Sequence, residues 1–124
     1  MVGVESTAHT LSLGFVGEDG ELFSSESALF KPEQGGIHPR EAADHHSVMA
    51  PKLISSLLSR DDFSRDDIIA VSFSQGPGLG PCLRIGASVA RSLSSVWKVP
   101  LIGVNHCVAH IEVGRNQTGC EDPV

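Results

Sequence analysis

The sequence has no long apolar segment and few cysteines, and both absences limit the kind of protein it can be. No apolar run approaches the ~18 residues of a membrane-spanning helix. Residues 1–5 lack the basic start and apolar core of a secretory signal peptide. The three cysteines, Cys82, Cys107 and Cys120, form no Cys-x-x-Cys pair, which indicates neither a disulfide framework nor a cysteine zinc site. We therefore expect a soluble cytoplasmic protein with reduced thiols.

Basic residues are also scarce. The chain has 9 lysines and arginines against 15 aspartates and glutamates, a net charge of -6 and a pI near 5.4. This balance gives no basic field to attract nucleic acid or an anionic membrane, so we expect no membrane partner. Any tRNA or DNA partner would need help from other chains or from further sequence. With 124 residues, of which 40% are hydrophobic, the chain can form one core but not two full domains.

The first half of the chain predicts three strands and a helix. Apolar residues 2–5, 11–16 and 22–30 are joined by short polar turns and predict an antiparallel meander. Pro39 suits the first turn of a helix because its missing N–H would have no partner there. This helix should end near residue 59, with a kink near residues 47–51 caused by Pro51. One buried stripe of this helix should contain Ala42, Ala43, Met49, Leu53, Ile54, Leu57 and Leu58.

The second half predicts two parallel strands with helices. After a charged link at 61–67, we expect a buried strand at 68–73, a glycine-rich turn at 74–80, a helix at 81–97 and a buried strand at 101–104 before a last helix. A helical crossover of this length joins parallel strands. The expected α/β fold is a five-stranded mixed sheet with the order β-β-β-α-β-α-β-α. This order resembles one lobe of the actin-like ATPase superfamily (ASKHA, ribonuclease H-like), in which two lobes clamp a nucleotide.

The first hairpin turn carries candidate catalytic and phosphate-binding residues. Ser6 and Thr7 offer hydroxyls and backbone N–H groups at the end of a strand, where a concavity can hold phosphate. The alternative is that they simply form a turn, because serine and threonine are common in turns. Glu5, the acidic residue at the strand end, and His9 are the candidate catalytic residues of this turn.

The glycine-rich segment at residues 74–86 is a second candidate site. Glycines between a strand and a helix let an anion approach the backbone, so Gly76 and Gly78 are candidate substrate-binding residues, with Arg84 as a partner for a carboxylate or phosphate. No Gly-Lys-Ser/Thr follows and the spacing is not Gly-x-Gly-x-x-Gly, so neither a Walker site nor a dinucleotide site is indicated. The alternative is a tight turn that lets strand and helix pack closely.

Two of the six histidines, His106 and His110, lie four positions apart, so a helix places both imidazoles on one face. The spacing matches the zinc pair of helical metalloproteases, but Cys107 stands where that pattern needs its glutamate base, and we expect Cys107 to pack in the interior. Two imidazoles are fewer than the three protein ligands of most catalytic zinc sites, so ordinary helix side chains are the alternative. His45 and His46 point about 100° apart, which favours surface or structural roles.

Four segments, at residues 3–10, 35–43, 73–81 and 91–111, together resemble the tRNA threonylcarbamoyladenosine transferases. This family comprises the catalytic subunit of the KEOPS complex and bacterial TsaD, formerly called O-sialoglycoprotein endopeptidases. The resemblance covers the entire chain and is to the archaeal or eukaryotic branch. It implies that residues 1–115 form an N-terminal actin-like lobe and that 116–124 begin the linker to a second lobe, absent here.

The resemblance also implies a reaction. The threonylcarbamoyl group passes from threonylcarbamoyl-AMP to N6 of adenosine 37 in tRNAs that read codons beginning with A. It implies one divalent metal per subunit, iron or zinc, on His106, His110 and an aspartate of the missing lobe, with ATP or threonylcarbamoyl-AMP between the lobes. Companion subunits, including a KEOPS-type kinase subunit and a dimerising subunit, would hold the tRNA. We expect the fragment alone to be inactive. The alternatives are a non-catalytic actin-like partner resembling TsaB and a metallopeptidase.

Overall fold

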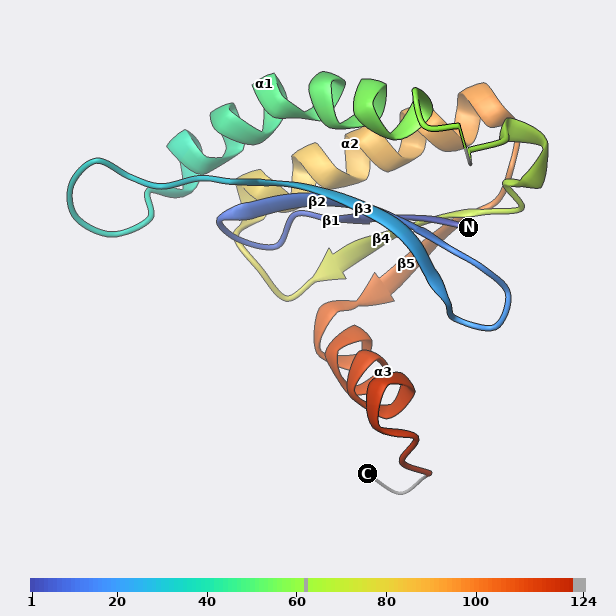
Figure 1. The fold of residues 1–124 in the computed structure, drawn as a ribbon. Helices are drawn as coiled ribbons and strands as arrows, with labels where there is room; N and C mark the ends of the chain where they lie inside the picture. Colours follow the sequence, from blue (N-terminus) through green and yellow to red (C-terminus); the bar gives the residue numbers. More distant parts are fainter. Residues whose placement is uncertain (62, 122–124) are drawn as a thin grey trace.

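The computed structural model describes residues 1–61 and 63–121 as a five-stranded sheet with helices on both sides (Figure 1). The elements in chain order are β1 (Val2–Glu5), β2 (Thr10–Val16), β3 (Leu22–Leu29), α1 (Pro39–Leu58), the 3-10 helix η1 (Arg65–Asp67), β4 (Val71–Gly76), α2 (Gly80–Trp97), β5 (Leu101–Asn105) and α3 (His106–Thr118). Apart from η1, this is the predicted order of strands and helices.

The strands lie in the order β3-β2-β1-β4-β5. β1 and β3 each pair antiparallel with β2, whereas β1, β4 and β5 run parallel to one another. The predicted mixed sheet is therefore confirmed. Because parallel strands end at the same edge of a sheet, the last residues of β1, β4 and β5 lie close together, although they are far apart in sequence.

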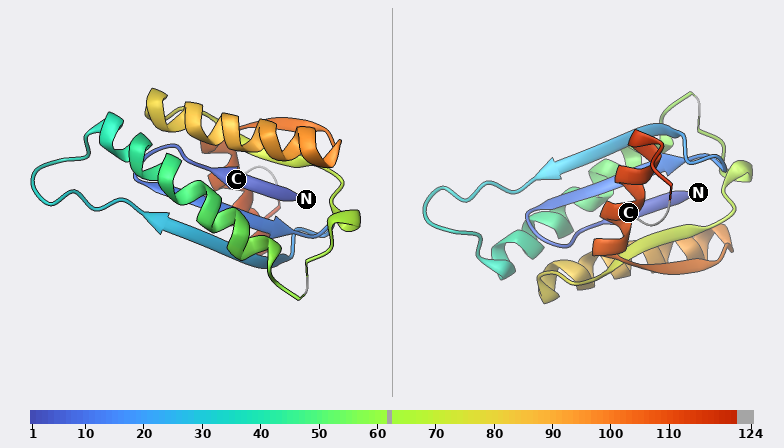
Figure 2. Two further views of the ribbon diagram at one scale, coloured as in Figure 1. Left: turned by 90° about the horizontal axis from the view of Figure 1, so that it is seen from above. Right: turned by 90° about the horizontal axis from the view of Figure 1, so that it is seen from below.

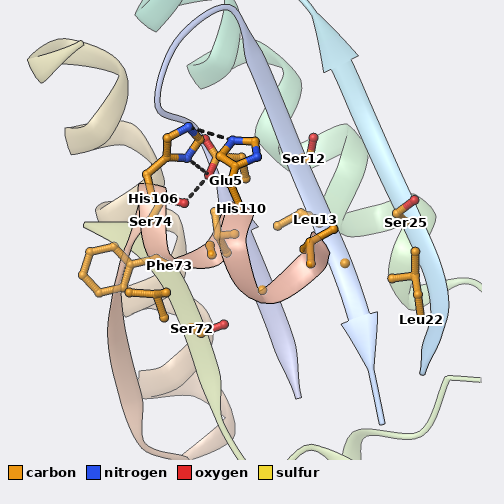
Figure 3. A pocket seen from close by; sticks show the side chains of 16 residues that line it. Glu5, Ser12, Leu13, Leu22, Ser25, Ser72, Phe73, Ser74, His106 and His110 are labelled. Carbon is orange, nitrogen blue, oxygen red and sulfur yellow. Dashed lines mark hydrogen bonds and ion pairs between the residues drawn. The ribbon is translucent and has the colours of Figure 1, made fainter. Parts of the chain in front are cut away.

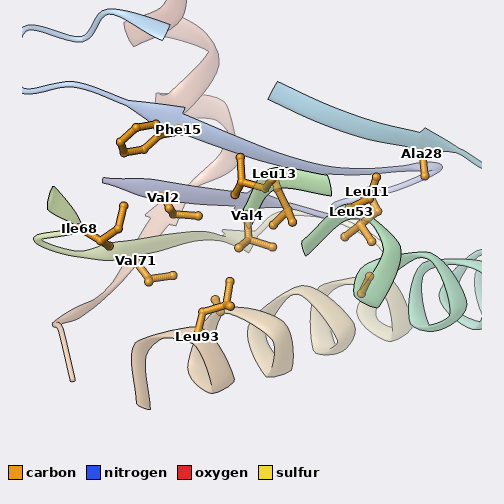
Figure 4. Close-up of a cluster of buried hydrophobic side chains, with 13 residues drawn as sticks. Val2, Val4, Leu11, Leu13, Phe15, Ala28, Leu53, Ile68, Val71 and Leu93 are labelled. Carbon is orange, nitrogen blue, oxygen red and sulfur yellow. The ribbon is translucent and has the colours of Figure 1, made fainter. Parts of the chain in front are cut away.

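The core lies between the sheet and the layer formed by α1 and α2 (Figure 4). The two helices lie side by side on one face of the sheet (Figure 2). Alternate strand residues point to this face, and burial of each large apolar side chain contributes about 1.5–3 kcal/mol. Buried members from the strands and helices include Val2, Val4, Leu11, Leu13, Phe15, Leu53, Leu57 and Leu93.

The opposite face of the sheet carries small side chains and is approached by α3 (Figure 2). Positions on this face include Gly3, Ser12, Gly14, Ser25 and Ser72. None of the described residues of α3 is buried. No helix within the described part of the chain has both the length and the apolar character needed to cross a membrane.

Several predicted boundaries in the first part of the chain need correction. The fourth strand begins at Val71 rather than at residue 68, because Ile68 caps the end of η1 and ladder pairing with β1 and β5 starts only at Val71. The strand then continues to Gly76, through residues predicted as a turn. Leu58, predicted in the buried stripe of α1, is 43% exposed, because it lies about 100° around the helix from the buried Leu57. α1 continues through Pro51 as one helix.

Two predictions of burial near the end of the chain were wrong. β5 is an edge strand with β4 as its only neighbour in the described sheet, so Ile102 is 43% exposed. Cys107 is exposed because α3 turns the side that carries His106, His110 and Val113 toward the sheet, and position 107 lies about 100° around the helix from His106.

Candidate active site

Glu5 and His106 meet at the edge where the parallel strands end. β1 ends at Glu5, and α3 begins at His106 directly after β5. As a result, His106 Nδ1 lies 3.2 Å from Glu5 Oε2 although 101 residues separate them (Figure 3). The contact places an imidazole and a carboxylate from opposite ends of the chain in one cluster.

Asn105 fixes the start of α3. Its side-chain oxygen accepts hydrogen bonds from the backbone N–H groups of Cys107 at 2.9 Å and Val108 at 3.2 Å, as an N-cap residue does. The helical turn that follows brings the Nε2 atoms of His106 and His110 to 3.1 Å. The two rings are almost perpendicular, with an interplanar angle of 89°.

The carboxylate of Glu5 accepts hydrogen bonds on both oxygens. The backbone N–H of Thr7 donates to Oε1 at 2.6 Å, the Thr7 hydroxyl donates to the same oxygen, and the Ser74 hydroxyl donates to Oε2. Burial by itself raises the pKa of Glu5, but the hydrogen bonds from Ser74 and Thr7 and the proximity of the His106 imidazole outweigh burial and bring the pKa below its ordinary value. Glu5 is therefore ionised at neutral pH.

The ionised carboxylate of Glu5 determines which nitrogen of His106 carries a proton. Because a carboxylate only accepts hydrogen bonds, neutral His106 is protonated on Nδ1 and has its lone pair on Nε2. In this arrangement the Nε2–H of His110 donates to His106 Nε2. Histidines that bind metals are typically held through their other nitrogen in this way, with a carboxylate as the acceptor.

The two imidazoles fit part of a metal site. Two Zn–N bonds of about 2.0–2.1 Å can join nitrogens up to about 4.2 Å apart, and the Nε2 atoms of His106 and His110 are 3.1 Å apart. His110 would first have to move its proton from Nε2 to Nδ1. Residues 1–61 and 63–121 contain no group of three His, Cys, Asp or Glu side chains placed to hold one ion.

A pocket of about 470 Å³ lies between α3 and the small-residue face of the sheet (Figure 3). Glu5, Ser74, His106 and His110 line the pocket, and its other walls are formed mainly by apolar and small side chains of the strands and α3. The imidazole pair is thus open to a molecule in this pocket.

Residues 21–124 match the model of the family described as TsaD: tRNA N6-adenosine threonylcarbamoyltransferase. The chain belongs to this family. Among curated TsaD relatives, the tRNA N6-adenosine threonylcarbamoyltransferases of Ignicoccus hospitalis and Archaeoglobus fulgidus are 48% and 50% identical to it over 124 and 123 residues. A probable bifunctional tRNA threonylcarbamoyladenosine biosynthesis protein of Methanocaldococcus jannaschii is 51% identical over 123 residues.

The chain is shorter than these TsaD relatives. The matches cover 100%, 99% and 99% of the chain but only 38%, 37% and 23% of the Ignicoccus, Archaeoglobus and Methanocaldococcus proteins, and they correspond to the N-terminal part. The predicted family is therefore confirmed, on a region that spans less than half of each relative.

Solved structures agree with the actin-like fold of this TsaD-family chain. YeaZ from Pseudomonas aeruginosa superimposes with a TM-score of 0.70 at 17% identity, over 97% of this chain and 49% of that one. RuvC of T. thermophilus in complex with a Holliday junction substrate gives a TM-score of 0.50 at 12% identity, over 86% and 64% of the two chains. At these identities the similarity shows the fold alone, and it confirms the predicted fold class.

The glycine-rich segment packs against the first hairpin turn. The backbone N–H of Leu79 donates to the Thr7 carbonyl at 2.7 Å, and a Cβ on Gly78 would lie 2.6 Å from that oxygen. Ser6 is 1% exposed, and its side chain occupies the space left by the missing Cβ of Gly86 in α2. These contacts agree with the alternative interpretation of the glycine-rich segment, a tight turn that allows close packing. The substrate-binding roles of Ser6, Thr7, Gly76 and Gly78 stay predictions.

The structure does not bring His9 or Arg84 to the imidazole pair. Both side chains are exposed, and neither lines the pocket beside His106. The catalytic role of His9 and the anion-binding role of Arg84 therefore remain predictions.

Sequence reasoning missed two residues that shape the site, Ser74 and Asn105. An asparagine directly before a His-x-x-x-His helix is an N-cap pattern, so Asn105 could have been identified from the sequence. The contact between Ser74 and Glu5 depends on the pairing of β1 with β4, for which the sequence carries no local signal.

Proposed function

We propose that this chain supplies Glu5, His106 and His110 to the active site of a tRNA N6-adenosine threonylcarbamoyltransferase. The reaction transfers the threonylcarbamoyl group from threonylcarbamoyl-AMP to N6 of adenosine 37 of tRNA. The observation that carries the proposal is the His106–His110 pair. Its Nε2 atoms are 3.1 Å apart, and the Glu5 carboxylate contacts Nδ1 of His106. The names of the relatives that are 48% and 50% identical support the same reaction.

Within this proposal the two imidazoles hold one divalent cation, iron or zinc. When bound, that cation supplies a positive charge that polarises the acyl carbonyl and stabilises the departing phosphate of AMP. Glu5 accepts a hydrogen bond from the Nδ1–H of His106 and so keeps the Nε2 lone pair directed at the site. The geometry favours this orienting role for Glu5 over direct proton transfer to the substrate, because three other hydrogen bonds already occupy its carboxylate.

The rest of the active site would lie outside this chain. We infer that residues 1–115 are the N-terminal lobe of a two-lobed protein, with ATP or threonylcarbamoyl-AMP between the lobes and the remaining metal ligand in the second lobe. The net charge of -6 leaves this chain without a basic field for tRNA, which supports tRNA binding through companion subunits. We propose that these are a kinase subunit and a dimerising subunit of a cytoplasmic KEOPS-type complex.

The two alternative functions have less support. A metallopeptidase of the His-Glu-x-x-His type needs a glutamate after the first histidine, and this chain has the exposed Cys107 there. A non-catalytic actin-like partner agrees with the similarity to YeaZ, but that similarity is at 17% identity and reports the fold only.

The test uses a full-length transferase in which this chain forms the N-terminal part. His106→Ala and His110→Ala should each lower bound iron or zinc, measured by mass spectrometry of the metals, and lower threonylcarbamoyladenosine in tRNA, measured by nucleoside analysis. His38→Ala is the matched control, since His38 is an exposed histidine outside the pocket. Unchanged metal content and unchanged modification in both active-site variants would overturn the proposal.

A further inference from the structure

His46 is a fully buried polar side chain that connects α1 with the first hairpin turn. Its side chain has 0% exposure, and its Nε2 atom lies 2.9 Å from the carbonyl oxygen of Ala8, 38 residues earlier in the chain. Its other ring nitrogen, Nδ1, lies 3.3 Å from Nδ1 of His45. Both nitrogens of this buried ring are therefore in contact with a polar partner.

These contacts define the protonation state of His46. The Ala8 carbonyl can only accept, so His46 carries its proton on Nε2, and its Nδ1 lone pair accepts from the Nδ1–H of His45. Burial lowers the pKa of His46 and the nearby His45 and His9 lower it further, against an opposing effect of the Ala8 carbonyl. The neutral ring can donate to the Ala8 carbonyl and accept from His45 at the same time.

The turn that His46 holds is the one that orients Glu5. Ala8 follows Thr7, whose N–H and hydroxyl both donate to Glu5 Oε1, and Glu5 Oε2 in turn contacts Nδ1 of His106. The opposite side of the turn is held by Leu79 through the Thr7 carbonyl at 2.7 Å. The turn is thus fixed by α1 on one side and by the start of α2 on the other.

We propose that His46 is a positioning residue for the His106–His110 pair, because its bond to the Ala8 carbonyl fixes the turn that aligns Glu5 with His106. The inference rests on the proposed role of that pair in metal binding. His46 does not line the pocket, so it acts on the site through Ala8, Thr7 and Glu5 rather than by contact with a bound molecule.

The primary readout is the tautomer of His106 in a full-length transferase that contains this chain as its N-terminal part, observed by nitrogen-15 NMR of the imidazoles. In the wild-type chain, His46 should be protonated on Nε2 and His106 on Nδ1. His46→Ala should shift His106 toward a mixture of tautomers, whereas His46→Gln, which keeps an N–H donor near the position of Nε2, should restore the wild-type signal. A purely structural role of His46 predicts the same His106 signal in all three chains.

The second readout is the Co²⁺ affinity of the same chains, followed by visible absorption. Loss of an outer contact that orients a metal-binding histidine typically costs about 10–100-fold in affinity, so His46→Ala should weaken Co²⁺ binding about tenfold and His46→Gln should recover most of it. Ala50→Gly is the matched control: it destabilises the same helix at another buried position and should leave both readouts unchanged.

The outcomes separate this inference from the proposed function. If no chain binds Co²⁺ but the His106 tautomer still depends on residue 46, the metal role fails and the positioning role stands. If the tautomer and the Co²⁺ affinity are the same in folded His46→Ala and wild-type chains, the inference is overturned. Should both His46 variants fail to fold, the wild-type spectrum decides, and a proton on Nδ1 of His46 would overturn the inference.

Discussion

The Nδ1 atom of His106 lies 3.2 Å from Oε2 of Glu5, so the first residue of α3 contacts the last residue of β1. The two residues are 101 positions apart in sequence, and they are brought together because β1 pairs with β4 and β4 pairs with β5. The metal-binding geometry proposed here therefore depends on the parallel half of the sheet as much as on the histidine spacing of the helix.

Replacing the Glu5 carboxylate should weaken metal binding. In Glu5→Gln the amide can donate to His106 Nδ1, which favours the tautomer with a proton on Nε2 and removes the lone pair that a metal needs. We expect Zn²⁺ affinity, measured by isothermal titration calorimetry, to fall about 10–100-fold. Glu33→Gln removes one exposed carboxylate away from the pocket and should have no effect. Equal affinities in all three chains would contradict an orienting role for Glu5.

Loss of the Asn105 cap should destabilise the start of α3. In Asn105→Ala the N–H groups of Cys107 and Val108 lose their side-chain acceptor, which typically costs about 1 kcal/mol. Helicity of α3 should fall, as measured by amide hydrogen exchange in its first turn. Asn105→Ser keeps an acceptor and should retain most of the protection. Similar exchange rates in the alanine and wild-type chains would show that Asn105 is not needed to start the helix.

A methyl group at Gly86 should disturb the packing of the first hairpin turn against α2. The added Cβ would overlap the side chain of Ser6, lying 2.9 Å from its Cβ, and overpacking of this kind typically costs about 1–3 kcal/mol. The free energy of unfolding in urea should fall in Gly86→Ala and recover in part when Ser6→Gly is added. Gly80→Ala is the control, because nothing lies within 4 Å of its added Cβ. A double variant no more stable than Gly86→Ala would argue against a direct clash.

The buried His46 should make the fold less stable in mild acid. Burial lowers its pKa, so the unfolded chain takes up a proton near pH ~6.5 while the folded chain takes it up only at lower pH. The contribution of His46 to stability should be complete above pH ~6.5 and be lost progressively as the pH falls toward its folded pKa. Urea denaturation at a series of pH values measures this loss.

His46→Gln, which cannot titrate, should lose this part of the pH dependence, whereas the exposed His38→Gln should keep it. The lowered pKa of Glu5 acts with the same sign but in a more acidic range, below about pH 4.5, so the two groups can be separated. An equal slope near pH 6 in the His46→Gln and wild-type chains would contradict the prediction.

Local patterns were sufficient to predict much of the architecture. The apolar segments at 2–5, 11–16 and 22–30 match β1, β2 and β3 closely, and Pro39 marks the start of α1. The predicted fourth strand was displaced by three residues from β4. The apolar run at 68–73 indicates burial, whereas β4 is defined by its pairing with β1 and β5. Burial of β5 was overestimated for a related reason, since an apolar strand does not reveal that it lies at an edge.

The candidate site was predicted only in part. The spacing of His106 and His110 is a local helical pattern, so the contact of their rings follows from the sequence once α3 is helical. The contacts of Ser74 with Glu5 and of His46 with Ala8 join residues 69 and 38 positions apart. Such contacts depend on strand order and on how α1 packs over the turn, and neither is encoded in a short motif.

Because Asn105 ends β5, caps α3 and is followed at once by His106, no loop separates the sheet from the imidazole pair. One residue inserted after Asn105 would rotate both rings by about 100° around the helix axis, away from Glu5. Insertions and deletions at this junction should therefore disrupt the site, although ordinary strand–helix connections tolerate them. The orientation of the two rings depends on the register of an edge strand.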